Sequence, residues 1–164
     1  MKVAILNIVM TALIAAIGSA ICDIIKVPVW MMFAGWIAFL AGGGTVKTAP
    51  VTFVCVLLGA ILGILGAFAI AQSGANLGSL ALPVAVFVIV AAALFAQFLP
   101  VVSSVIGYFC GMTVFFASGL PLTGSSLLVI GTGVAVGIAS GLLASTLCMR
   151  MTAGAAANVA RLGD

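Results

Sequence analysis

Long apolar runs, separated by short polar or turn-forming segments, dominate the pattern of the chain. A helix needs roughly 20 apolar residues to cross a bilayer, and a run qualifies when it comes close to that length. The qualifying runs cover about residues 3–22, 27–44, 49–72, 80–99, 101–119 and 124–149. The segments between them carry Asp, Lys, Pro, Gly or Ser, which end helices or form turns. The pattern predicts an all-α, polytopic membrane protein with about six transmembrane helices.

The break at Pro100 is the least distinct, because proline also kinks membrane helices without ending them. An alternative has five spans, with Leu80–Gly119 as one broken hairpin or a re-entrant pair. A β-barrel is disfavoured, because the apolar runs are continuous and do not alternate with polar residues. The first run resembles a signal peptide, with Lys2 before it and small residues at Gly18–Ala20, but we expect a membrane helix.

Composition makes lipid the expected solvent. The 164 residues are 66% hydrophobic and 4% charged, whereas soluble domains are about 25% charged. The formal charge of +3 therefore indicates no nucleic-acid partner, and its use is in setting orientation. Loops rich in Lys and Arg stay in the cytoplasm, so six spans place Lys2, Lys47, Arg150 and Arg161 inside and Lys26 outside. Both termini are thus expected in the cytoplasm.

The inventory of reactive side chains argues against an enzyme. The chain has no His, and its acids are Asp23 and Asp164. A histidine base, a carboxylate pair and a His or carboxylate metal cage are therefore excluded. Neither Ser103 nor Ser104 lies in the Gly-x-Ser-x-Gly context of a hydrolase nucleophile. We expect no catalytic residues, no metal and no cofactor.

The cysteines are far apart and lie in or beside apolar runs, at Cys22, Cys55, Cys110 and Cys148. Buried cysteine usually behaves as a small hydrophobe, so we expect reduced thiols. A less favoured alternative is a Cu(I) site, because thiolates and thioethers suit that ion. Its ligands would be Cys110, Met112, Met31 and Met32.

Two stretches share an unusual spacing of Phe, Gly and Ala: "FAGWIAFLAGGG" and "FCGMTVFFASG". The matches pair Phe33, Gly35, Phe39, Ala41 and Gly43 with Phe109, Gly111, Phe115, Ala117 and Gly119. Each stretch lies in the middle span of three, and a repeat with an odd number of spans enters the membrane inverted. We therefore expect one transmembrane domain over residues 1–164 built from two inverted three-helix repeats. Repeat one covers about 1–75 and repeat two about 76–150, with a short tail over 151–164.

The third and sixth spans also resemble each other, in "LGAILGIL" and "TGVAVGIA", whereas the first and fourth show no convincing match. This alignment pairs Gly59 with Gly133 and Gly63 with Gly137. Small residues four apart let helices approach closely in lipid. We expect helix-packing faces at Gly59, Gly63, Gly133, Gly137 and Gly141. Six short helices enclose little volume, so we also expect a homo-oligomer.

Aromatic residues suggest a site where the two repeats meet. Trp36 lies about 9 Å beyond Trp30, at 1.5 Å per helical residue, and is central in its span. Lipid offers no partner to a central indole N–H, so Trp36 is expected to face protein or a cavity. The crossing of the repeats predicts a pore or substrate-binding constriction at Phe33, Gly35, Trp36, Phe39, Tyr108, Phe109, Gly111, Met112 and Phe115. Ordinary packing is the alternative for these side chains.

Charge is confined to the ends of the predicted spans. Asp23 and Lys26 are three apart, so they can pair on one helical turn at the outer mouth, with Trp30 nearby as an interfacial anchor. A gate or an electrostatic filter is the alternative role for the pair. The remaining polar groups within spans are uncharged: Thr11, Thr52, Gln97, Ser104, Thr113 and Ser140. Proton-coupled transport normally needs a buried ionisable relay, so this set favours passive passage.

The string "VPVWMMFAGWIAFLAGGG", Val27–Gly44, resembles the hallmark of a bacterial inner-membrane family catalogued as domain of unknown function 1097. The residues that carry the resemblance are Pro28, Trp30, Phe33, Gly35, Trp36, Phe39, Gly43 and Gly44. The resemblance implies a small multi-pass protein of the bacterial cytoplasmic membrane. It implies no activity, because the family has none assigned.

Two functions follow from these features. The first is a passive channel or facilitator for a small, neutral or weakly polar solute, such as urea or another amide. The second is a non-transporting assembly subunit that docks partner helices through its Gly-rich faces. A continuous cavity between Trp36 and Phe115 favours the first, and solid packing between them favours the second.

Overall fold

The computed structural model describes residues 2–163, with side-chain environments for residues 3–155. The described chain is all-helical, which confirms the predicted fold class. Its elements are α1 (Lys2–Ile24), α2 (Val29–Ala41), α3 (Ala49–Leu77), a short 3-10 helix η1 (Gly78–Leu80), α4 (Ala81–Ala96), α5 (Val105–Ser118) and α6 (Gly124–Gly163). Each predicted apolar run therefore contains one α-helix.

The helices differ in length more than the runs predict. Three stretches are long and apolar enough to cross a membrane: Val3–Ile24, Ala49–Ala96 (α3 through α4) and Gly124–Ala155. By contrast, α2 and α5 have only 13 and 14 residues, fewer than the roughly 20 that a perpendicular helix needs to cross the hydrocarbon core. The expected tail is part of α6 as far as Gly163, and Asp164 lies outside the described residues. These features are those of a helical membrane protein with two short inner helices.

Local chemistry explains where the short helices begin and end. Pro28 precedes α2, and its fixed φ suits the start of a helix. Ser104 caps α5, because its side chain accepts a hydrogen bond from the Gly107 N–H at 3.2 Å. Gly119 ends α5 in the left-handed conformation, at φ 62°, which glycine adopts without steric cost.

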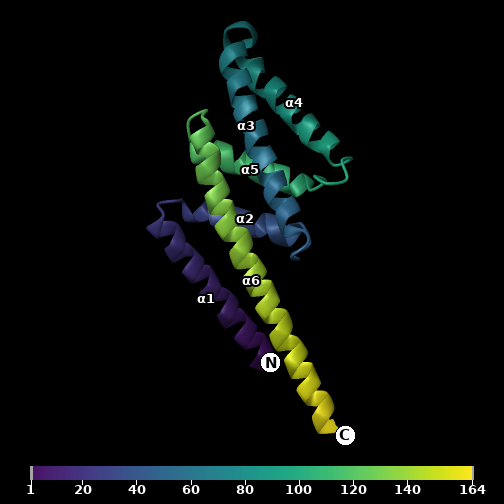
Figure 1. The fold of residues 1–164 in the computed structure, drawn as a ribbon. Coiled ribbons are helices and arrows are strands. Elements are labelled where there is room, and N and C mark those ends of the chain that lie inside the picture. Colours follow the sequence, from purple (N-terminus) through teal and green to yellow (C-terminus); the bar gives the residue numbers. More distant parts are fainter. Residues whose placement is uncertain (1, 164) are drawn as a thin grey trace.

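The two halves of the chain are interlocked and inverted. In Figure 1, α2 and α5 cross the middle of the molecule in opposite directions, and α3 and α6 also run in opposite directions. The most extensive helix contacts join α3 to α5 and α2 to α6, and the next join α1 to α6 and α3 to α4. Exchanging α1 with α4, α2 with α5 and α3 with α6 turns the α3–α5 contact into the α2–α6 contact. The same exchange turns the α1–α6 contact into the α3–α4 contact. The contacts therefore have the pattern of a pseudo-two-fold axis between two three-helix repeats.

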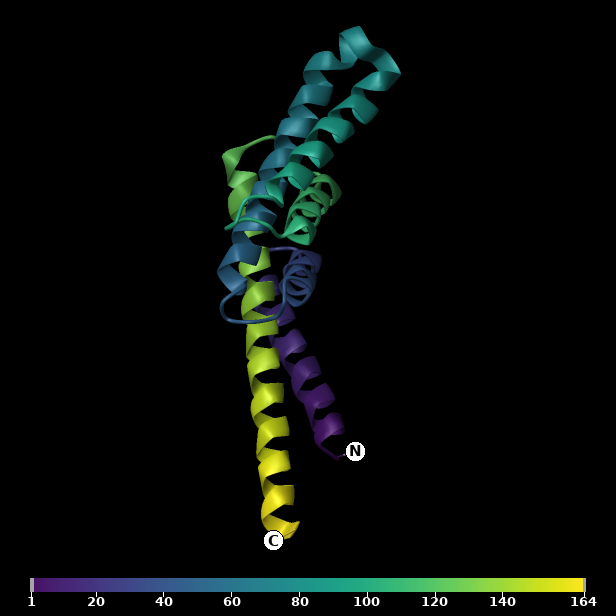
Figure 2. The ribbon, with the colours of Figure 1, turned by 90° about the vertical axis from the view of Figure 1, so that its right-hand side faces the viewer.

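Buried positions repeat with the same symmetry. In α2 the buried residues are Met31, Met32, Gly35, Trp36, Ala38 and Phe39, and in α5 they are Gly107, Tyr108, Gly111, Met112, Val114 and Phe115, with identical spacing. Figure 2 views α2 and α5 along their axes, with both helices lying on one side of the long helices α3 and α6. The buried faces of the short helices thus point toward α3 and α6, and their other faces are exposed.

Candidate functional site

Where the two halves of the chain cross, glycines bring the backbones of neighbouring helices into direct contact. A Cβ on Gly59 would overlap the backbone of Tyr108, and one on Gly137 would overlap the backbone of Met32. Tyr108 on α5 and Met32 on α2 occupy equivalent places in the two halves. These two contacts are therefore one contact repeated by the pseudo-two-fold axis, and both let helices approach as closely as small residues allow in lipid.

The short helices supply the second pair of close contacts. A Cβ on Gly111 would overlap the carbonyl oxygen of Val56 in α3. A Cβ on Gly35 would lie 2.5 Å from the carbonyl oxygen of Val134 in α6. The predicted match between Gly35 and Gly111 thus corresponds to equivalent positions in the fold. Because neither glycine has a side chain, its helix touches the backbone of the neighbouring long helix, and no space remains beside Trp36.

The symmetry of α3 and α6 differs from the alignment of their sequences. A Cβ on Gly63 would lie 2.9 Å from the side chain of Phe115, and one on Gly141 would lie 2.8 Å from that of Phe39. Gly63 therefore corresponds to Gly141, and Gly59 to Gly137. The expected pairs with Gly133 and Gly137 are one helical turn off, while Gly133 itself packs against the Met31 side chain. All five glycines expected at packing faces contact helices of the same chain.

Phe39 and Phe115 lie at the centre of the molecule, where the constriction was expected. They are 0% and 4% exposed and share one apolar cluster with Val114 and Ile138, among others. Side chains from both halves therefore fill this region. The pair is part of the core, and neither ring faces an open space.

The other residues of the expected constriction are divided between two flanks. Trp36 packs with Ile14 and Ala144 on the α1 side. Tyr108 and Met112 belong to a separate cluster beside α4. Phe33 and Phe109 lie outside both clusters and are 43% and 41% exposed. The structure thus brings Phe39 and Phe115 together but leaves Trp36 and Met112 in symmetry-related clusters on opposite sides.

A groove of about 560 Å³ lies between α1 and α2. Its floor includes Trp36, and one wall is formed by the small side chains of Ala12 and Ala15. The lining is Asn7, Ile8, Thr11, Ala12, Ala15, Phe33, Trp36 and Ile37, so Asn7 and Thr11 are its polar members. The groove is an apolar surface that this chain leaves unfilled.

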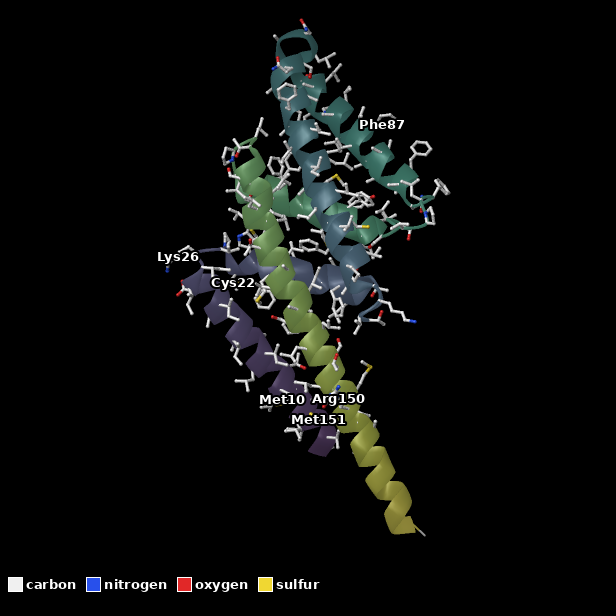
Figure 3. The ribbon with its side chains drawn as sticks, viewed as in Figure 1. Met10, Cys22, Lys26, Phe87, Arg150 and Met151 are labelled. Atoms are coloured by element: carbon white, nitrogen blue, oxygen red, sulfur yellow. The ribbon has the colours of Figure 1, made fainter. Side chains whose placement is uncertain are left out.

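The symmetry-related groove, between α4 and α5, is smaller at about 400 Å³. Val86 and Val90 take the places of Thr11 and Ala15 on its wall. Phe87, labelled in Figure 3, takes the place of Ala12 and points outward, with 73% of its surface exposed. The two halves therefore differ where their outer helices meet the membrane: α1 presents a hollow, and α4 presents protruding aromatics.

Asp23 and Lys26 form the expected ion pair at the end of α1, with Nζ and Oδ1 3.6 Å apart. Both side chains are 81% exposed, so the pair lies at the surface and encloses no passage. Figure 3 shows Lys26 at the extremity of the α1–α2 loop. Trp30 is 39% exposed on the first turn of α2. This geometry is that of a surface turn with an aromatic beside it.

A polar cluster between α1 and α6 escaped sequence reasoning. Asn7 donates to Thr152 Oγ1 at 3.3 Å, and Thr11 Oγ1 lies 3.6 Å from Cys148 Sγ. The Asn7 Oδ1 atom is buried and has no hydrogen-bond partner among the described residues. An asparagine inside an apolar run was the available signal, since such a side chain seeks a partner in lipid.

The sulfur atoms considered as copper ligands do not gather in one place. Met31 lies in the central cluster, with Cys110 packed against its edge. Met112 belongs to the separate cluster beside α4. Among the described residues, no three His, Cys, Asp or Glu side chains come close enough to hold a metal ion.

Comparisons with known proteins give a family and no activity. The chain matches the model of a family described as "Protein of unknown function (DUF1097)" over residues 1–149. Neither the curated proteins nor the solved structures include one that matches the chain.

Proposed function

Because the chain belongs to the DUF1097 family, whose function is unknown, we propose from its geometry that it is a non-transporting membrane assembly subunit. The observation that carries this proposal is the filled crossing of the two halves. Backbone contacts at Gly59, Gly111 and Gly137 surround the region where a solute path was expected. Phe39 and Phe115 occupy its centre. A permeation path needs space or polar groups at that place.

The proposed docking surface is the groove between α1 and α2, because the Gly-rich faces are already used within the chain. Its Ala12 and Ala15 wall admits a helix at short distance, as small residues do in lipid. Its apolar lining suits an uncharged transmembrane helix. Thr11 is a partner for a polar group of such a helix.

We propose that the occupant is α4 of a second copy of this chain. Phe87 and Phe95 lie eight positions apart, hence on one side of α4, and are 73% and 71% exposed. They are protruding side chains of the kind that a hollow lined by alanines accommodates. If each copy inserts α4 into the groove of the other, the same contact is made twice and the assembly closes as a symmetric dimer.

Membrane placement follows from the alternating direction of the helices. If the six helices cross the membrane in alternating directions, the start of α1, the 42–48 loop, the 97–104 loop and the end of α6 share one side. That side carries Lys2, Lys47, Arg150 and Arg161, and the other carries Lys26. By the positive-inside rule the first side is cytoplasmic. We propose the bacterial cytoplasmic membrane as the location.

Photocrosslinking in native membranes tests the docking. Benzoylphenylalanine at position 87 is expected to give a product of twice the chain mass, with the crosslink mapping to residues 8–15 of α1. An exposed aromatic position on α3, Phe68, serves as the control and should give no such product. Ala15→Trp fills the groove and should abolish the dimer, whereas Phe68→Trp on α3, outside both contact surfaces, should preserve it. A product between the chain and another protein, or none at all, would contradict the dimer.

Passive transport of a small neutral solute is the second candidate, favoured by the inverted repeats and by the position of Asp23 and Arg150 toward the ends of their spans. Stopped-flow swelling of proteoliposomes with urea, other amides and glycerol separates the two. The assembly proposal predicts the same permeability as empty liposomes. Solute flux in wild type that disappears in Trp36→Ala would establish the transport function instead.

A further inference from the structure

The two short helices leave the same positions exposed. The exposed residues of α2 are Trp30, Phe33, Ile37, Leu40 and Ala41, and those of α5 are Ile106, Phe109, Thr113, Phe116 and Ala117. The spacing is identical, so the pseudo-two-fold axis relates the two sets. Residues spaced by three and four lie on one side of a helix, and Figure 2 shows both helices on one side of α3 and α6. Together they form one almost wholly apolar surface, the α2–α5 face.

Neither helix of this face is long enough for an ordinary bilayer. With 13 and 14 residues, α2 and α5 reach about 20 and 21 Å at 1.5 Å per residue, whereas the hydrocarbon core is about 30 Å thick. The flanking segments 25–28, 42–48, 97–104 and 119–123 are non-helical and mostly exposed. Lipid does not tolerate exposed irregular backbone, because its N–H and C=O groups need partners. If α2 and α5 span the membrane, the hydrocarbon beside them is therefore about 10 Å thinner than usual.

The long helices are compatible with such a thin layer. The 29 residues of α3 extend about 44 Å, and Figures 1 and 2 show α3 and α6 crossing α2 and α5 at a steep angle. A helix longer than the layer fits by tilting, whereas no tilt lengthens a short helix. One layer therefore accommodates all the described helices only if its thickness matches α2 and α5.

We propose that bilayer thickness controls the pairing of two copies, an inference that rests on the proposed dimer. Thinning the bilayer around a short helix costs free energy for each Å of mismatch. In a single copy, lipid covers Phe33 and Ile37. In the dimer, α4 of the second copy takes the place of that lipid, because both side chains line the groove that receives it.

The inserted helix fits α2 in length as well as in shape. With 16 residues, α4 extends about 24 Å, so it is closer to α2 in length than an ordinary bilayer is. Pairing hides one face of each of these short helices from lipid. The dimer therefore deforms less lipid than two single copies, and it becomes more stable as the bilayer becomes thicker.

Photocrosslinking in liposomes of defined thickness tests this control. The chain with benzoylphenylalanine at position 87 is reconstituted in dimyristoleoyl-, dioleoyl- and dierucoyl-phosphatidylcholine, at several protein-to-lipid ratios. The apparent dissociation constant of the dimer should fall by about tenfold or more from the thinnest bilayer to the thickest, because the mismatch cost accumulates over several Å. Ala15→Trp should remove the product in every lipid, and Phe68→Trp should retain it.

The outcomes separate this inference from the dimer itself. A dimer whose dissociation constant does not change with acyl-chain length would overturn the inference and leave the proposed function standing. No dimer in any of the lipids would refute both. A dissociation constant that rises with chain length would also overturn the inference, because the mismatch would then be greater in the dimer.

The depth of Trp30 measures the thinning without reference to the dimer. The chain has two tryptophans, so Trp36→Phe leaves Trp30 as the only one. Quenching by lipids brominated at known depths should place it about 10 Å from the bilayer centre, half the length of α2. A designed single-span peptide with flanking tryptophans is the control and should give about 15 Å, half the usual hydrocarbon thickness. The same depth for Trp30 as for the peptide would overturn the inference. The crosslinking assay retains both tryptophans and is decisive if Trp36→Phe is unstable.

Discussion

Replacing Gly111 with alanine tests whether the crossing of the halves is as tight as the structure indicates. The added methyl group would overlap the carbonyl oxygen of Val56 and lie 2.6 Å from the backbone nitrogen of Ala60. Nonbonded heavy atoms prefer about 3.5 Å or more. Both neighbours are backbone atoms inside α3, so no side chain can rotate away. The helices α3 and α5 must separate, which also weakens the surrounding contacts.

The magnitude follows from two opposing effects. Overpacking a well-packed core costs about 1–3 kcal/mol, and here the strained atoms belong to the backbone. Alanine is about 1 kcal/mol better than glycine inside a helix, which offsets part of the cost. We expect Gly111→Ala to lower the free energy of unfolding by about 1–2 kcal/mol. Gly137→Ala should lose a similar amount, because a Cβ there would overlap the backbone of Met32 in the equivalent place.

Unfolding by sodium dodecyl sulfate in mixed micelles, followed by tryptophan fluorescence and circular dichroism, measures this difference. Gly74→Ala is the matched control, because position 74 is helical and no atom lies within 4 Å of its added Cβ. It should be as stable as wild type or more stable by up to about 1 kcal/mol. The reasoning fails if Gly111→Ala unfolds at the same detergent fraction as Gly74→Ala.

Three further predictions concern other parts of the chain. Phe39→Ala should lower the free energy of unfolding by at least about 2 kcal/mol, because it leaves a cavity in the core. Phe33→Ala removes a half-exposed ring and should lower it much less. Equal losses in the same unfolding assay would contradict the packing. Asp23→Asn should leave the unfolding curve unchanged, since exposed ion pairs contribute little; a clear loss would show that the pair is structural. Lys26→Cys should react with an impermeant maleimide on intact cells and Lys47→Cys only after permeabilisation, and reaction of both on intact cells would refute the proposed orientation.

The sequence predicted the helices better than their packing. Apolar runs and breaking residues placed one helix in each expected segment, because lipid demands long apolar stretches and Pro or Gly ends them. The match of Phe33 with Phe109 also gave the correct correspondence of α2 and α5. The register of α3 and α6 was wrong by one turn. Glycines four residues apart give the same local pattern when the alignment shifts by four. The correct register is set by the contacts of Gly63 with Phe115 and of Gly141 with Phe39.

Other features had no readable signal in one sequence. The sequences of α1 and α4 show no match, although the two helices are equivalent in the fold. Ile14 and Ile89 are buried in equivalent places, but their neighbours differ in size and polarity. Which face of a membrane helix is buried cannot be read from polarity when every face is apolar. Aromatic residues near the midplane therefore suggested a constriction, while Phe39 in fact packs against the other half.

The interlocked contacts constrain how the protein is made. Because α2 finds its main partner in α6, and α6 leaves the ribosome after the other described helices, α2 must wait in the bilayer until α6 has been made. During that interval α2 and its backbone-exposing Gly35 are open to chaperones, proteases and wrong partners. By contrast, α3 and α5 are both made before α6 and can already pack against each other. A chain truncated before α6 leaves α2 without its partner and should therefore be degraded quickly.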